Sequence, residues 1–348
     1  MKSAGRAALV LAWFCVAAAG GGATAASQPT SIGLVHSAAS APLYIGIANQ
    51  YFAGEGLDAK LEFFASDKLV QKAVAEGKVD FGLTNLTAAF FDYAAEHRLK
   101  IIASQVSDQT GFPATALLIS KSAYDAGLRS VKDFPHRRIA VPGPGSGVRY
   151  SLARIAARYG LGPDTFSLVW LQTPAREMTA LSRGEVDAAA LPFATALQLY
   201  LSGKGAFVIR LSNLAERQEG VVFTRAQLIE TNRSTVDSFM RAYRRAVAEY
   251  DLTFQQRDDE GTVLPGPHFV DYLTLIARQG NLAPDILQYS LPYCDHLARV
   301  DVTDLENQLT FWQSQGMADK SIAVTDLLDL SFAGPLARPG VSAARQIE

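Results

Sequence analysis

The order of short apolar runs and amphipathic segments constrains the fold of this chain most. From residue 31 onward, a short apolar run is followed by a segment with apolar residues at helical spacing, and this unit recurs over most of the chain. Strands that alternate with helices in this way are typical of βαβ units, which form parallel sheets covered by helices. The sequence therefore predicts an α/β protein.

The alternation falls into two blocks. The expected strands of the first block are 31–35, 61–64, 79–83, 101–106 and 116–119, and those of the second are 138–141, 168–171, 186–191 and 207–211. A chain of 348 residues is long enough to divide into two cores. We expect lobe 1 to begin with residues 27–117, lobe 2 to span 118–217, and residues 218–348 to complete lobe 1.

The last third of the chain has a different pattern. After one more apolar strand at 221–223, apolar residues recur at helical spacing over 234–256, and further helices are expected up to 303–315. These segments predict a helical C-terminal extension on the first lobe.

The first 26 residues have the pattern of an export signal. Lys2 and Arg6 precede an uncharged apolar run from Ala7 to Ala19, and the small residues Ala23-Thr24-Ala25 suit a signal peptidase. The run is shorter than the roughly 20 residues that a membrane-spanning helix needs. We predict a cleavable signal peptide over residues 1–26 and a periplasmic protein, with a permanent amino-terminal anchor as the alternative.

Charge and cysteine content argue against several classes. The formal net charge is −2 without a run of lysine and arginine, so nucleic acid is not an expected partner. Once Cys15 is removed with the signal peptide, Cys294 is the remaining cysteine, which excludes an internal disulfide. The histidines lack metal-binding spacing, and no G-x-S-x-G motif is present. We expect no enzyme, no cofactor and no metal site.

A glycine-rich segment follows the expected strand 138–141. Backbone N–H groups at the start of the next helix attract anions, and ligands of open α/β sheets bind at the carboxyl ends of strands. Ser146 offers a hydroxyl and Arg149 a charged fork, and basic residues outnumber acidic ones over 118–217. We interpret the segment from Gly145 to Arg149 as an anion grip, with an ordinary strand-to-helix turn as the alternative.

Further ligand contacts are expected at the other strand ends and in the neighbouring loops. In the first lobe the candidates are Ser37, Ser40, Tyr44, Ser66, Thr84, Asn85 and Thr110. In the second lobe they are Gly145, Ser146, Gly147, Arg149, Thr173, Arg176 and Phe193. For Tyr44 a place in the apolar core is an equal alternative, and Arg176 is a second candidate for binding a carboxylate or sulfonate.

Four segments in this order resemble the nitrate/sulfonate/taurine-type family of solute-binding proteins. They are APLYIGIANQYFAGEGLDAKLEFF from Ala41, AVAEGKVDFGLTN from Ala73, SVKDFPHRRIAVPGPGSG from Ser130 and ALSRGEVDAAALPFA from Ala180. The resemblance implies a two-lobed periplasmic-binding-protein clamp, in which each lobe is a mostly parallel sheet flanked by helices.

The same resemblance implies the partners. The clamp would capture a small-molecule solute and present it to the membrane permease of an ABC-type importer, and we expect it to act as a monomer. From the residues above we expect a small organic, anionic solute of the sulfonate or carboxylate kind. Two alternatives stay open: an enzyme of the same fold acting on a small aromatic or pyrimidine-like metabolite, and a ligand-binding component that feeds a sensor.

Overall fold

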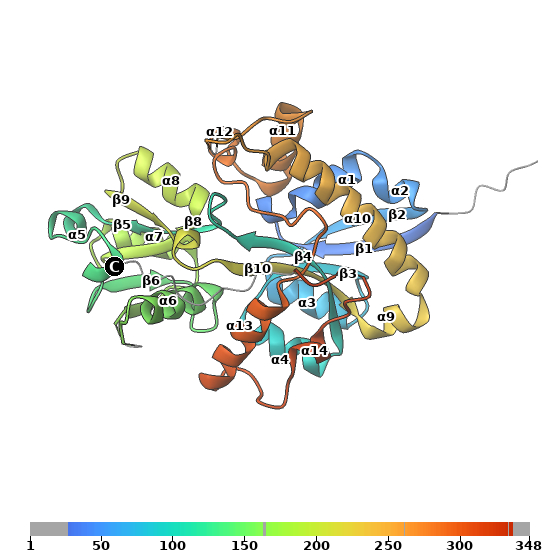
Figure 1. The fold of residues 1–348 in the computed structure, drawn as a ribbon, viewed down its shortest axis with the longest axis horizontal. Coiled ribbons are helices and arrows are strands. Elements are labelled where there is room, and N and C mark those ends of the chain that lie inside the picture. The colour runs from blue at the N-terminus through green and yellow to red at the C-terminus, as the bar shows by residue number, and fades with distance from the viewer. Residues whose placement is uncertain (1–26, 163–164, 261, 333, 337–348) are drawn as a thin grey trace, which may run out of the picture.

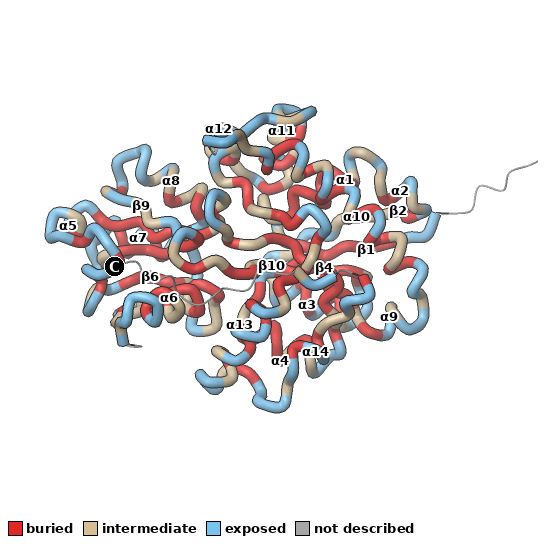
Figure 2. The backbone as a smooth tube through the Cα atoms, in the orientation of Figure 1, coloured by how far each residue is buried: buried red, intermediate tan, exposed pale blue. Residues whose placement is uncertain are grey.

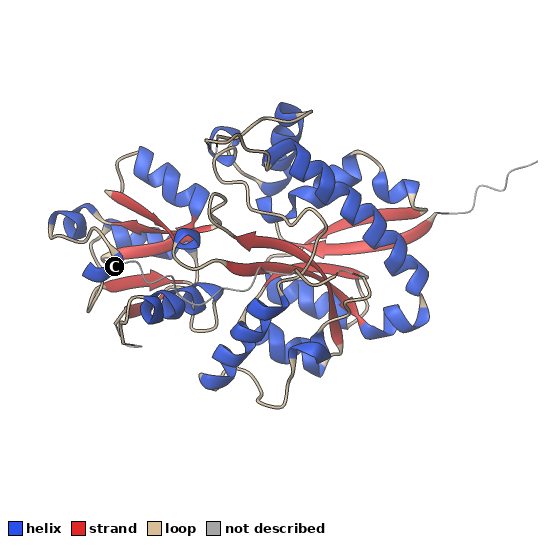
Figure 3. Cartoon of the chain, in the orientation of Figure 1, coloured by secondary structure: helices blue, strands red, loops and turns tan. Residues whose placement is uncertain are grey.

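The computed structural model describes residues 27–162, 165–260, 262–332 and 334–336. The expected signal peptide, residues 1–26, lies outside the described residues. Figure 1 shows two lobes side by side along the long axis of the molecule. Helices cover both faces of the sheet in each lobe (Figure 3).

The first lobe contains a five-stranded sheet in the order β2-β1-β3-β10-β4. Its strands are β1 (Gln28–Leu34), β2 (Leu57–Phe63), β3 (Phe81–Asn85), β4 (Leu99–Asp108) and β10 (Arg217–Arg225). β1 pairs in parallel with β2 and β3, whereas β10 runs antiparallel to both β3 and β4. Since β4 then points the same way as β3, β10 is the single reversed strand.

The second lobe repeats this topology with the order β7-β6-β8-β5-β9. Its strands are β5 (Thr115–Ile119), β6 (Arg138–Val141), β7 (Ser167–Trp170), β8 (Ala188–Pro192) and β9 (Phe207–Arg210). β6 pairs in parallel with β7 and β8, and β5 runs antiparallel between β8 and β9. The prediction of two mostly parallel sheets is thus confirmed, with one reversed strand in each.

The reversed strand β5 differs from the sequence prediction. The sequence assigns an apolar strand at 116–119 to the first lobe, and a boundary between residues 117 and 118 would cut β5 in two. In the structure the chain crosses to the second lobe over 109–114 and returns over 214–216. The sequence of an apolar strand that is buried on both faces does not indicate which sheet the strand joins, because its partner strands are distant in sequence.

Helices of the first two blocks flank the sheets. On the first lobe they are η1 (Ala38–Ser40), α1 (Ala41–Ala48), α2 (Tyr51–Gly54), α3 (Asp67–Ala75) and α4 (Ala88–Glu96). On the second lobe they are α5 (Lys121–Asp125), η2 (Val131–Asp133), α6 (Gly147–Arg158), α7 (Pro174–Ser182), α8 (Phe193–Leu201) and η3 (Leu211–Asn213).

The C-terminal helices pack on the first lobe, as predicted. They are α9 (Ala226–Thr231), α10 (Arg233–Phe254), α11 (Phe269–Gly280), α12 (Pro284–Leu287), α13 (Val302–Ser314) and α14 (Val324–Leu327). Phe239 of α10 stacks on Phe81 of β3 with ring centroids 3.8 Å apart, while Trp312 of α13 is buried in the cluster on the other face. Figure 2 shows the buried strands inside both lobes. Within the described ranges, no helix combines the length and the apolar character needed to cross a membrane.

The lobes touch through α6 of the second lobe. The Tyr150 hydroxyl donates to Oδ1 of Asp304 on α13 at 2.8 Å, and Nη1 of Arg154 lies 3.2 Å from the same atom. Asp304 Oδ2 also accepts from the backbone N–H of Gln218 on β10, at 2.7 Å. One buried carboxylate therefore joins α6, α13 and the strand on which the chain returns to the first lobe.

A substitution at Gly82 of β3 tests the packing of the first sheet. A Cβ atom at Gly82 would lie 2.5 Å from Cζ of Phe223 and 2.9 Å from Cγ2 of Val74, both fully buried. We expect Gly82→Ala to lower the free energy of unfolding by about 1–3 kcal/mol, because the core has no room for another methyl group. Gly54→Ala is the matched control, since a Cβ there meets nothing within 4 Å. Equal denaturant midpoints for the two variants would contradict this packing.

Candidate functional site

A cavity of about 480 Å³ lies between the lobes, near the carboxyl ends of the parallel strands. The first lobe lines it with the loop after β1, the start of α3, the residues after β3, and β10. The second lobe contributes the start of β5, the starts of α6 and α7, and the junction of β8 with α8. A molecule held in this cavity would contact both lobes.

Much of the cavity wall is apolar. The aliphatic and aromatic side chains that line it come from both lobes, and they are Leu86, Val106, Val148, Leu191 and Phe193. Pro142, Pro192 and Pro292 add rigid apolar surface. Such a wall, with a few polar groups set into it, is typical of sites for small organic molecules.

Glu177 is the most unusual side chain of the cavity. It lies on α7 of the second lobe, is 0% exposed, and neither carboxylate oxygen has a hydrogen-bond partner among the described residues. Burial raises the pKa of Glu177 to about 7. A buried carboxylate without a partner costs free energy, so its place in the wall of an open cavity points to an external partner.

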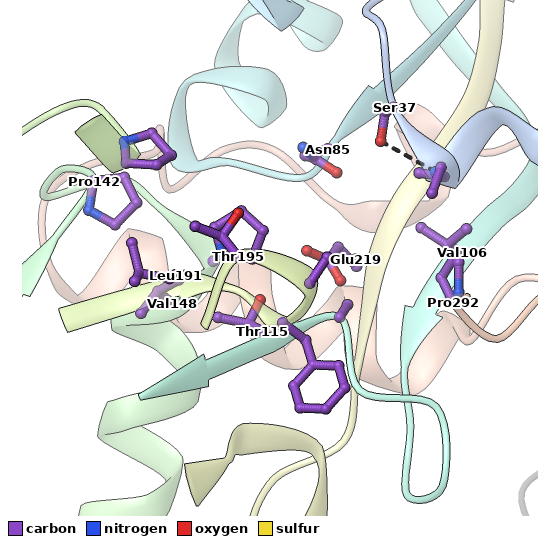
Figure 4. Close-up of a pocket in the computed structure, with 18 of the residues that line it drawn as sticks. Ser37, Asn85, Val106, Thr115, Pro142, Val148, Leu191, Thr195, Glu219 and Pro292 are labelled. Carbon is purple, nitrogen blue, oxygen red and sulfur yellow. Dashed lines mark hydrogen bonds between the residues drawn. The ribbon is translucent and has the colours of Figure 1, made fainter. Parts of the chain in front are cut away.

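Asp67 and Glu219 face the cavity from the first lobe. Asp67 follows Ser66, the cap of α3, and its Oδ2 accepts from Nδ2 of Asn85 at 3.3 Å. Burial raises the pKa of Asp67 to about 6, and the charge of Glu219 adds to the effect. In Figure 4, Glu219 reaches into the space between Asn85 of the first lobe and Thr115 and Thr195 of the second.

Arg217 is the cationic partner of this acidic group. The guanidinium is 3% exposed and its Nη2 lies 3.1 Å from Oε1 of Glu219. The charges of Asp108 and Asp304 also act on it. Asp108 is fully buried, and burial together with the charge of Glu219 raises its pKa to about 7 despite Arg217. One guanidinium is therefore shared by several carboxylates.

The glycine-rich loop faces the cavity only in part. The Ser146 hydroxyl donates to the Gly143 carbonyl at 2.9 Å, and the Gly145 carbonyl accepts from the backbone N–H of Ala88 in the other lobe. A Cβ atom on Gly147 would lie 2.6 Å from Nη1 of Arg217, so a glycine here lets the guanidinium pack beneath α6. The loop thus makes a contact between the lobes as well as a cavity wall.

The two arginines expected to bind an anion lie away from the cavity. Nη1 of Arg149 donates to the Pro144 carbonyl at 3.1 Å, and Nη2 donates to the Gln315 side chain. Arg176 is exposed, and Glu177, the next residue, is the one that lines the cavity. Arg149 faces α13 of the first lobe and Arg176 faces solvent, so neither side chain lines the cavity. Of the predicted anion grip, Ser146 and Gly147 line the cavity.

The other sequence candidates divide between cavity and scaffold. Those that line the cavity are Ser37, Asn85, Ser146, Gly147 and Phe193. Those buried in the first lobe are Ser40, Tyr44 and Thr84, of which Tyr44 belongs to the apolar core. Ser66 and Thr173 cap α3 and α7, Thr110 donates to the Ser212 carbonyl at the crossing between lobes, and Gly145 contacts Ala88.

The charged residues of the cavity were not predicted from the sequence. The candidates named from the sequence include neither Asp67 nor Glu177, and they omit the Arg217–Glu219 pair. Glu177 could have been predicted as a site residue from its place in the first turns of the helix that follows a strand end. Arg217 and Glu219 could have been predicted from their position just before an apolar strand, where the chain returns between the lobes. Within the described ranges, no three His, Cys, Asp or Glu side chains gather as metal ligands.

Comparison with known proteins identifies relatives at the level of family and fold. The sequence model of the family described as NMT1/THI5 like matches residues 37–251. No curated protein sequence matches the chain.

Several solved structures share the fold. The alkanesulfonate-binding protein SsuA from Xanthomonas axonopodis pv. citri, bound to MOPS, has 19% sequence identity and a TM-score of 0.65 over 88% of this chain and 99% of that one. The periplasmic aliphatic sulphonate binding protein SsuA from Escherichia coli has 16% identity and a TM-score of 0.67 over 88% and 98%. The periplasmic nitrate-binding protein NrtA from Synechocystis PCC 6803 has 13% identity and a TM-score of 0.59 over 86% and 84%.

The pKa of Glu177 predicts how stability depends on pH. Because this pKa is raised to about 7 from an ordinary value of 4.5, the folded protein binds a proton that the unfolded chain releases, and stability falls as pH rises between those values. Glu177→Gln removes this loss. We expect its melting temperature to exceed that of the unmodified protein at about pH 8, by the equivalent of roughly 2–3 kcal/mol, and the two to converge near pH 5.

The control for this measurement is Glu185→Gln, which makes the same change at an exposed position of the same lobe. We expect it to follow the unmodified protein across the whole pH range. A constant difference between Glu177→Gln and the unmodified protein at all pH values would contradict the assignment.

Proposed function

The chain belongs to the NMT1/THI5-like family, and from this we propose that it is the solute-binding component of an ABC-type importer. The observation that carries the proposal is the cavity between the lobes, whose walls come from both. A solute in this position bridges the lobes and stabilises their closed arrangement. A permease can recognise that arrangement as the loaded state.

The connections between the lobes suit such a clamp. The chain crosses twice, over 109–114 and 214–216, so the lobes are joined by short segments. Domain closure about a ligand uses a few residues at the ends of elements as hinges. At the rim, the backbone N–H of Ala88 donates to the Gly145 carbonyl at 2.9 Å, a contact that opening of the lobes would break.

The structural relatives support the proposed compartment and the proposed solute-binding function. The solved structures above include sulfonate-binding and nitrate-binding proteins, two of them described as periplasmic. We propose the same compartment for this chain, with residues 1–26 as the signal that directs its export. The partners are then a small organic solute and a membrane permease, and the protein acts as a monomer.

Thiol catalysis has no support at this site. Cys294, the cysteine among the described residues, is 1% exposed within the core of the first lobe and does not line the cavity. Burial raises its pKa well above the ordinary value, which keeps the thiol protonated and unreactive. We propose that the solute leaves the cavity chemically unchanged.

Native mass spectrometry after incubation with a fractionated bacterial metabolite extract tests the proposal. We expect one small molecule to bind, to raise the melting temperature, and to be recovered with its mass unchanged. Thr195→Trp fills the cavity and should abolish binding, whereas Gln198→Trp, an exposed position on the same helix, should retain it. Recovery of a chemically altered molecule, or no bound molecule from any fraction, would contradict the proposal.

A further inference from the structure

We propose that the solute carries a protonated amino or amidino group on an apolar body, and that Glu177, Asp67 and Glu219 bind this cation. The inference rests on the proposed function, because it assigns a chemical class to the solute of the same cavity. It replaces the anionic solute expected from the sequence.

Glu177 carries the first part of the argument. Its side chain is fully buried, lines the cavity, and has two carboxylate oxygens without a partner among the described residues. Above its pKa of about 7 the Glu177 carboxylate is ionised and acceptor-only, so the partner that it lacks there is a hydrogen-bond donor. An ammonium or amidinium group supplies both the donors and the compensating charge.

The first lobe adds further carboxylate oxygens as hydrogen-bond acceptors. Oδ1 of Asp67 and Oε2 of Glu219 are buried oxygens without a hydrogen-bond partner. Carboxylates therefore face the cavity from both lobes. A cation between them would be held as a bridge, which is the contact that a closing clamp needs.

Arg217 does not reverse this balance. Among the lysine and arginine residues of the described ranges, it is the one that lines the cavity. Its Nη2 is 3.1 Å from Oε1 of Glu219, and the charges of Asp108 and Asp304 act on it as well, while its Nε has no hydrogen-bond partner among the described residues. His36, the remaining titratable group of the wall, places Nδ1 2.7 Å from the Gln279 carbonyl and stacks on Phe63. The cavity therefore has more carboxylates than cationic groups to neutralise them.

The electrostatics also couple the cation to closure. With the cavity empty, closing the lobes brings Glu177 of one lobe toward Asp67 and Glu219 of the other, and like charges repel. A bound cation turns this repulsion into attraction from both sides. The solute thus has a higher affinity for the closed arrangement, and this difference is what shifts the equilibrium toward closure.

The apolar part of the cavity wall indicates the character of the uncharged part of the solute. Val106, Val148, Leu191 and Phe193 line the cavity together with several prolines. This apolar surface disfavours further charges on the solute and favours a solute with an aliphatic or aromatic body. The geometry points to a small organic amine or amidine instead of a compact inorganic ion.

Two matched sets of probes test the charge directly. The aromatic set is phenethylamine, 2-phenylethanol and 3-phenylpropionate, and the aliphatic set is hexylamine, hexanol and hexanoate. Within a set the body is similar and the charge changes from positive to neutral to negative. By calorimetry and thermal shift at pH 8, we expect the amine to bind most tightly in at least one set. If no amine exceeds its neutral and anionic partners, the proposal is overturned.

Substitutions link the binding to the named carboxylates. We expect Glu177→Gln to weaken the bound amine about 10- to 100-fold, and Glu185→Gln to leave its affinity within about twofold. Asp67→Asn, on the first lobe, is the second variant and should weaken the amine in the same direction. Unchanged amine affinity in both cavity variants, with unchanged circular dichroism, would overturn the assignment.

The two proposals fail in different ways. If the molecule recovered from the metabolite extract is an anion that is bound and released unchanged, the solute-binding function stands and the cationic class is wrong. If that molecule is chemically altered, the solute-binding function itself is wrong.

Discussion

The arrangement of the two lobes depends on one buried carboxylate, Asp304. It is 4% exposed and accepts hydrogen bonds from the Tyr150 hydroxyl of the second lobe and from the backbone of Gln218 in the first. Gln308, one turn later on α13, donates to the same carboxylate and to the Gln218 carbonyl. Hydrogen bonds to a buried charge are among the stronger ones in proteins, so this junction fixes where α6 stands relative to β10. Both elements line the cavity.

The same junction explains the charge of the cavity. Arg217 and Glu219 stand on either side of Gln218 on β10, so the strand that joins the lobes also supplies the central charged pair of the site. The guanidinium packs under Gly147 and pairs with Glu219, and the charges of Asp108 and Asp304 also act on it. Glu177 and Asp67 are left facing the cavity without an equivalent partner. The connection between the lobes and the proposed solute recognition therefore use neighbouring residues of one strand.

Periodicity predicted most of the scaffold and little of the site. The alternation of apolar runs and helical segments is a local property, and it predicted both sheets and the helices on the first lobe. It assigned β5 to the wrong lobe, because the sequence of an apolar strand does not indicate its partner strands. Arg149 and Arg176 were chosen as candidates for their charge and for their place near the end of an expected strand. Their side chains point away because neighbouring helix positions differ by about 100° in direction, and Glu177, one residue later, takes the inward position.

The sequence by itself determined the α/β class, the two similar halves, the helical extension and the strand ends near which a ligand would lie. Each follows from spacing along the chain, which local sterics and the burial of apolar surface convert into helices and strands. Only the tertiary structure decided which charges face the cavity. That choice depends on how α6, α7 and β10 are rotated and brought together across the lobes, and packing between residues far apart in sequence sets those rotations. For this reason the solute that we propose is a cation, whereas the sequence predicted an anion.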